Sequence, residues 1–350
     1  MSIQNLPHTI FTGHHKGGHI QGIALDRDRR YIYCSFTTEL VKLDLEGNFI
    51  GSVKGLTGHL GCLCLGTDGR IYGSLEYKND AIGKGILKNL GMDGSLQDAF
   101  YVAIFDGEKI DRADMDAEKD GVMTTVYLKD VVDDYSAEEN GTKHRFGCSG
   151  IDGITFAPAF GENGKHDLYV TYGVYGDVTR DDNDYQVILR YDTTDWKSME
   201  RPLSQNDIHH SGPEKYTERY FAFTGNTTYG VQNLEYDPYL KRWFMAVYTG
   251  QKPQYPNLPM YMLDGEKPAS PEKLRGLDME GLVPAQWEKG IPHESGVWGW
   301  DFPYGSTGMI ALGDGYYYFS ENGRDENGQF STIRLYRWNG EGNAPFVPVE

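Results

Sequence analysis

Five segments of the sequence begin alike, and this internal repeat limits the possible folds more than any other feature. Four of the five segments begin with a small residue. In each segment a polar residue or glycine then precedes a short apolar run that is typical of a β-strand. The segments are Gly18-HIQGIAL, Gly58-HLGCLCL, Ser149-GIDGITF, Tyr229-GVQNLEY and Gly305-STGMIAL. Their starts are 40, 91, 80 and 76 residues apart, so loops of unequal length must separate the repeats.

Each apolar run is followed by a turn and then by a second, aromatic-rich strand. Aromatic residues make up 13% of the chain and glycine occupies 44 positions, a mixture that favours short strands joined by tight turns. The second strands are expected at 30–36, 70–77, 166–173, 242–248 and 315–321. Third strands follow, several ending in an acidic residue or Asn before Gly, and fourth strands are read at FIGSV, MTTVYL and RYFAF. The outer strand of the fourth repeat is expected near 281–287, and the longest helical candidate is 270–278.

This pattern predicts an all-β chain that forms a single domain over residues 1–350. We expect a β-propeller of five blades, each of four antiparallel strands, with inner strands starting near residues 19, 59, 150, 230 and 306. The N-terminal HTIFTGHHKGGHIQG is similar to FIGSVKGLTGHLG, so the first strand should complete the last blade and close the ring. An open β-sandwich, two β-domains, or a sixth blade within the insertions are the alternatives.

The sequence resembles five-bladed propellers over nearly its whole length. In the arabinanase-like glycosidases of this kind, carboxylates on the inner strands of the first three blades carry out acid/base catalysis. The matching positions here are Gln21, Gly61 and Asp152, so only one carboxylate is present. The resemblance therefore does not imply their two-carboxylate hydrolysis.

Histidines concentrate in the loops that lead into the inner strands. Six of the ten lie there or directly beside them: His14, His15, His19, His59, His144 and His293. The connections between second and third strands, which reach the same face of a propeller, are also long, whereas those on the opposite face are mostly tight. Long polar loops at one end of a rigid scaffold are a common place for binding, so we expect the functional site on this face.

His19 and His59 occupy the same position in their repeats and should face each other at the mouth of the central channel. With Asp152 they form the candidate catalytic centre. Three interpretations remain open: a polar plug of the channel, a site for one divalent metal ion held by His19, His59 and Asp152, and metal-free acid/base catalysis. None of the spacings decides between them.

A second set of residues is expected to bind substrate. Trp298 and Trp300 could stack on a sugar ring, or could instead pack between blades, and Arg180 could bind a carboxylate. The full set comprises Gln21, Gln232, Tyr229, His293, Glu294, Trp298, Trp300, Asp301 and Arg180.

These features predict an enzyme acting on a small polar ligand, carbohydrate or lactone-like, by hydrolysis, elimination or isomerisation. The alternative is a non-catalytic propeller that binds a glycan or a protein with the same face. A net charge of −18 disfavours nucleic acid and anionic membranes as partners, and no nucleotide-binding motif predicts a nucleotide cofactor. The N-terminus has no signal-peptide pattern, which predicts a cytoplasmic protein, or a secreted or periplasmic one if a signal peptide has been removed.

Overall fold

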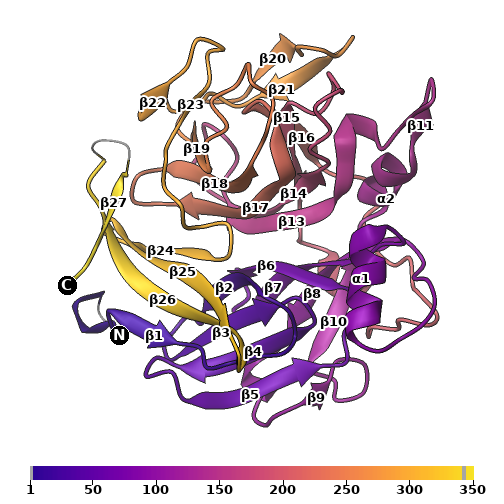
Figure 1. The fold of residues 1–350 in the computed structure, drawn as a ribbon, viewed down its shortest axis with the longest axis vertical. Coiled ribbons are helices and arrows are strands. Elements are labelled where there is room, and N and C mark those ends of the chain that lie inside the picture. Colours follow the sequence, from indigo (N-terminus) through magenta and orange to yellow (C-terminus); the bar gives the residue numbers. More distant parts are fainter. Residues whose placement is uncertain (1–2, 341–343) are drawn as a thin grey trace.

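The chain forms a ring of five antiparallel β-sheets, a five-bladed β-propeller (Figure 1). The structure is a computed structural model and describes residues 3–340 and 344–350. In Figure 1 the colours run around the ring from indigo to yellow, so the blades follow one another in chain order. This arrangement confirms the fold predicted from the repeat.

One strand of each repeat lines the central axis. These inner strands are β2 (Ile20–Leu25), β6 (His59–Leu65), β13 (Cys148–Ala157), β17 (Thr227–Asp237) and β24 (Met309–Gly313). Each starts within three residues of its predicted position. Every residue of β2 and of β13 is buried, because adjacent blades cover both faces of an inner strand. This is why the inner strands read as near-continuous apolar runs rather than as alternating ones.

The remaining blade strands follow in chain order towards the rim. Second strands are β3 (Tyr31–Phe36), β7 (Ile71–Tyr77), β14 (Asp167–Val174), β18 (Arg242–Thr249) and β25 (Tyr316–Asp325). Third strands are β4 (Glu39–Asp44), β8 (Ala99–Phe105), β15 (Tyr185–Tyr191), β19 (Met260–Asp264) and β26 (Gly328–Trp338). Outer strands are β5 (Phe49–Lys54), β10 (Met123–Tyr127) and β16 (Glu218–Phe223).

The last blade receives its outer strand from the N-terminus. β1 (Thr9–Phe11) pairs antiparallel with β26, with Ile10 opposite Ile333, and joins the start of the chain to its end. β27 (Phe346–Pro348) pairs with another part of β26. The first and last segments therefore lie side by side (Figure 1), as the sequence comparison of the two N-terminal repeats predicts.

The fourth blade has three strands in its ladder, and its expected outer strand near 281–287 lies elsewhere. β21 (Glu280–Val283) pairs with β16 of the third blade and with β20 (Ser270–Lys273), which occupies part of the predicted helix at 270–278. Pro284 follows β21 directly, and proline cannot donate the hydrogen bond that a continuing strand needs. Beyond it, only single bridges join Gln286 and Trp300 to β19.

Short elements fill the insertions. Helices α1 (Ala81–Asn89), α2 (Lys129–Ser136) and α3 (Trp196–Met199) lie in the connections of the second and third blades, and the short strands are β9 (Met115–Asp116), β11 (Glu138–Glu139), β12 (Thr142–Lys143), β22 (Ile291–Pro292) and β23 (Trp298–Gly299). The Asp80 carboxylate accepts hydrogen bonds from the first turn of α1 and caps that helix. None of the helices in the described residues is long and apolar enough to span a lipid bilayer.

Two buried side chains, Asn233 and Cys62, close the axis midway; we call them the axial plug. The Asn233 amide on β17 donates to the carbonyl oxygens of Gln21 at 2.8 Å and Ser306 at 3.0 Å. The Cys62 thiol on β6 donates to Asn233 Oδ1 at 3.2 Å. The axial plug links four blades and divides the axis into two parts. The upper part lies towards the loops that lead into the inner strands, and the lower part lies towards the tight turns.

Candidate functional site

The upper end of the axis gathers side chains that are remote in sequence. His59, at the start of β6, has its Nδ1 3.7 Å from Asp152 Oδ1 on β13. His19 directly precedes β2 and lies near enough to lower the pKa of His59. The structure thus brings the three predicted catalytic residues together, because their positions open neighbouring inner strands.

The site contains an ion pair that the sequence reading missed, between Glu76 on β7 and Lys78, which directly follows β7. Lys78 Nζ lies 2.6 Å from Glu76 Oε1 and also donates to the Ser149 carbonyl at 2.8 Å. Glu76 Oε2 accepts from the Ile151 amide at 3.0 Å. Only 3% of Glu76 and 4% of Lys78 are exposed. The available signal was a Glu and a Lys two residues apart in an otherwise apolar strand, where both must share one face.

Glycine makes room for these carboxylates. A Cβ on Gly150 would lie 2.0 Å from Glu76 Oε2, and the φ of +127° at that residue also favours glycine. A Cβ on Gly61 would lie 2.9 Å from Asp152 Oδ1. Gly61 and Gly150, each the third residue of its inner strand, therefore leave space for an acidic group of the neighbouring blade.

Burial of the Asp152 carboxyl group favours its protonated form. Burial raises the pKa of its carboxyl well above the usual range, and the negative charge of Glu76 raises it further, while Lys78 opposes both. Its Oδ2 accepts a hydrogen bond from Gln232 Nε2 at 3.2 Å, and its backbone carbonyl accepts from Ser74 Oγ at 2.6 Å. These contacts fix a carboxylic acid in place, ready to donate.

His59 is an uncharged imidazole with an unsatisfied nitrogen. Its Nδ1 is buried, lacks a hydrogen-bond partner, and lies 3.5 Å from Glu76 Oε1 as well as 3.7 Å from Asp152 Oδ1. Burial lowers the pKa of His59, and the Lys78 charge lowers it further. A buried polar atom without a partner is costly, and here it faces two groups that can share a proton with it.

His19 and Tyr248 form the other side of the site. The Gln21 amide donates to Thr37 Oγ1 at 3.2 Å and to His19 Nδ1 at 3.5 Å, so the hydrogen of this imidazole belongs on Nε2. His19 Nε2 then donates to the Tyr248 hydroxyl oxygen, 3.3 Å away. Burial and Asp152 raise the pKa of Tyr248 to about 12, so the phenol keeps its hydrogen free for a ligand.

A pocket lies beside His19 at the edge of the site. It has a volume of about 570 Å³ and lies between that residue, the end of α1 near Leu90, and the turn between β25 and β26 near Asp325. The long second-to-third-strand connections therefore wall the approach, as expected from their lengths.

Some predicted substrate-binding residues lie at this site and others do not. Gln21 and Gln232 contact His19 and Asp152. Tyr229 donates nothing to the centre but accepts from Gln232 through its backbone carbonyl, and its ring lines a separate pocket of about 470 Å³ that Arg180 also lines. Arg180 is already bonded to both oxygens of Asp182 and to the carbonyls of Lys143 and His144, so it offers no free fork for a carboxylate.

The segment from His293 to Asp301 corrects our expectation of a stacking rim. Trp300 bridges Met260 at the outer edge of the fourth blade, and only 1% of it is exposed, so it packs between blades four and five against Trp338. Trp298 belongs to the small hairpin of β22 and β23 in the same region, away from the inner strands (Figure 1). The other three predicted residues lie on this segment too: His293, bonded to Ser295, and the exposed Glu294 and Asp301.

A metal ion is not favoured by the geometry of the centre. Among residues 3–340 and 344–350, no group of three or more His, Cys, Asp or Glu side chains is placed to hold one. The Lys78 ammonium already supplies the positive charge between the carboxylates. The centre contains one ion pair, two imidazoles whose pKa values are lowered by burial, and an acid whose pKa is raised by burial.

The fold and this centre define a five-bladed β-propeller with an upper axial site. No family model matches the sequence, and no curated protein matches it. Among solved structures, a putative gluconolactonase is 12% identical over 96% of this chain and 78% of its own, with a TM-score of 0.37. A soluble aldose sugar dehydrogenase from Escherichia coli is 9% identical, covering 93% and 98%, with a TM-score of 0.40, and the Dos1 propeller is 12% identical, covering 93% and 78%, at 0.31. These values are too low to transfer a substrate or a reaction to this chain.

Proposed function

We propose that the chain is an enzyme that carries out proton-transfer chemistry on a small, uncharged, hydroxyl-rich ligand at the upper end of the axis. A carbohydrate or a lactone-like molecule has this chemistry, and hydrolysis, elimination and isomerisation of such molecules all need a proton donor and acceptor. The observation that carries the proposal is the unpaired Nδ1 of His59, held 3.5 Å from Glu76 and 3.7 Å from Asp152.

The charges of the site support an uncharged ligand. Glu76 and Lys78 neutralise each other, and the remaining groups are a carboxylic acid, imidazoles, amides and a phenol. Such groups exchange hydrogen bonds with hydroxyl and carbonyl oxygens without leaving a charge buried and unpaired.

Each group has a distinct part in the proposal. Asp152 gives its proton to a substrate oxygen, and the resulting carboxylate is stabilised by Gln232 and Lys78. In the return step, the proton released by the substrate or by its attacking water goes to His59 Nε2, while His59 Nδ1 gives its own proton to the Asp152 carboxylate and restores the acid. Tyr248, whose oxygen is occupied by His19, donates its own hydrogen to a substrate oxygen.

Turnover of sugars, glycosides and lactones by the purified protein tests the proposal. We expect Asp152→Asn to lower kcat about 10²–10⁴-fold, since the amide keeps the contact with the site but cannot give up a proton in this way. Asp301→Asn, an exposed acid on the outer edge of blade four, is the matched control and should leave kcat unchanged. Saturable binding without turnover, or turnover insensitive to Asp152→Asn, would contradict the proposal and favour a binding module.

Metal content measured on the same preparation, purified without chelator, tests the metal alternative. We expect no stoichiometric divalent ion. A stoichiometric ion that is lost in both His19→Ala and His59→Ala would replace metal-free acid/base chemistry by the metal-assisted kind.

A further inference from the structure

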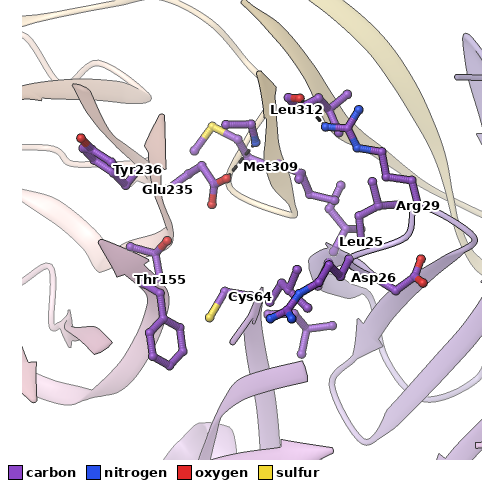
Figure 2. Close-up of a pocket in the computed structure, with 17 residues that line it drawn as sticks. Leu25, Asp26, Arg29, Cys64, Thr155, Glu235, Tyr236, Met309 and Leu312 are labelled. Atoms are coloured by element: carbon purple, nitrogen blue, oxygen red, sulfur yellow. Dashed lines mark hydrogen bonds between the residues drawn. The ribbon is translucent and has the colours of Figure 1, made fainter. Parts of the chain in front are cut away.

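A second pocket lies at the lower end of the axis, opposite the site above. It has a volume of about 270 Å³ and is lined by the ends of all five inner strands (Figure 2). The axial plug of Asn233 and Cys62 separates it from the upper site. It is therefore a blind pocket that opens on the face with the tight turns.

One carboxyl group reaches into this pocket. Glu235, on β17, accepts a hydrogen bond at Oε1 from the Ala311 amide at 2.8 Å. Its Oε2 has no hydrogen-bond or ion-pair partner in the part of the chain that the structure describes. Figure 2 shows Glu235, Thr155 and Cys64 around one hollow, contributed by three different blades.

Apolar side chains line part of the remaining wall. Leu25, Leu63 and Leu65 are contributed by β2 and β6, and Met309 and Ile310 by β24. The two arginines at the rim are turned to backbone carbonyls, Arg27 to Thr67 and Arg29 to Leu312, both at 2.7 Å. A carboxyl group in such surroundings lacks the cation that a buried acid normally has.

The surroundings also set the protonation of Glu235. Burial raises the pKa of Glu235 to about 8, Asp237 raises it further, and the Ala311 amide lowers it. β13 and β24 contribute no titratable side chain to the lining. The titratable and charged groups nearby are Asp26, Arg27, Arg29, Cys64, Tyr236, Asp237 and Tyr317. At neutral pH the acid is mostly protonated, and a cation that binds beside it must displace that proton.

We propose that the lower pocket binds a small primary alkylamine, whose ammonium pairs with Glu235 Oε2 while its alkyl stem packs against Leu25 and Leu63. The volume lies just below the range of small-molecule sites, so only a short ligand fits. A single carboxylate with one free oxygen suits an ammonium better than a metal ion, which needs several ligands. The net charge of −18 attracts cations to the molecule as a whole.

Binding of n-butylammonium, measured by titration calorimetry or NMR, tests this proposal, with n-butanol and butyrate as neutral and anionic comparators of the same length. We expect saturable binding of the amine only. Because the free acid has a raised pKa while an alkylammonium stays charged to about pH 10, affinity should rise about tenfold per pH unit from pH 6 towards pH 8.

Glu235→Gln is the matched variant, since its amide oxygen can still accept from Ala311. It should bind the amine at least about tenfold more weakly at pH 8 and show no pH dependence. Asp152→Asn, at the far side of the axial plug, should bind it as the natural chain does, so this result is independent of the proposed enzyme activity. Butanol binding as tightly as the amine, an unchanged affinity in Glu235→Gln, or no saturable binding of the amine would overturn the proposal.

Discussion

The chemical state of each residue at the upper site is set by its neighbours rather than by its own type. Burial and the charge of Glu76 raise the pKa of Asp152. Burial also raises the pKa of Glu76, while Lys78, 2.6 Å away, lowers it. His59 is neutral because burial and the same Lys78 charge disfavour its protonation. A single substitution should therefore change the titration of a different residue.

Glu76→Gln is the substitution that shows this coupling. Removing the negative charge takes away one of the causes that raise the pKa of Asp152 and leaves Lys78, which lowers it. The acid form of Asp152 should then be lost at a lower pH. In a profile of kcat/KM against pH, we expect the alkaline limb to shift to lower pH in Glu76→Gln. An unmoved limb, with the activity scaled down uniformly, would mean that Glu76 only supports the structure.

The sequence predicted the site residues that lie at equivalent positions of the repeat. His19, His59 and Asp152 were found because equivalent positions of a repeat converge on the axis. Glu76 and Tyr248 belong to second strands and Lys78 directly follows one, and no alignment of the inner strands reveals how far these residues lie from the axis. The position of Trp300 was predicted wrongly because it precedes an inner strand in the sequence. In the structure it forms a β-bridge with Met260 on β19, at the outer edge of the fourth blade.

At the scale of elements, strands were predictable and insertions were not. Runs such as β3 and β18 combine aromatic and β-branched residues between turns, a local signal. The helices α1 and α2 were missed because each is short and lies within a long insertion. β20 and β21 pair with the edge of the neighbouring blade, a tertiary contact that local propensity does not contain.

The axial plug gives a prediction about how elements are held together. Asn233→Ala removes the donor for the Gln21 and Ser306 carbonyls and the acceptor for Cys62. Leaving buried groups without partners should lower the free energy of unfolding by about 1–3 kcal/mol per group. Urea unfolding measures this, with the exposed Asn163→Ala as control. Equal stability of both variants would mean that the axial plug does not hold the inner strands.

At the scale of the whole molecule, the closure of the ring joins the two ends of the chain. β1 has an alternating pattern in which Ile10 is buried, 1% exposed, between exposed neighbours. Ile10 packs in a cluster shared with β2, β4 and β26, so it contacts both the first and the last blade. The sequence predicted this closure because the same pattern, an outer strand followed by an inner strand, occurs at the N-terminus and at 49–61.

Ile10→Ala tests the closure directly. Deleting this buried side chain should lower the free energy of unfolding by about 2–5 kcal/mol. Thr9→Ala, the exposed residue beside it on the same strand, should change it by less than about 0.5 kcal/mol. Thermal or urea unfolding of the two variants gives the comparison, and a cost of Ile10→Ala no greater than that of Thr9→Ala would show that β1 does not close the ring.

The central claim is that three residues from three blades form one coupled proton-transfer centre. Nitrogen-15 NMR of the histidine side chains, recorded across pH, measures this most directly. The account predicts that His59 stays neutral to well below pH 6.5, the ordinary histidine pKa, and that Asp152→Asn shifts its titration while Asp301→Asn does not. A His59 that titrates near pH 6.5 and ignores Asp152→Asn would contradict it.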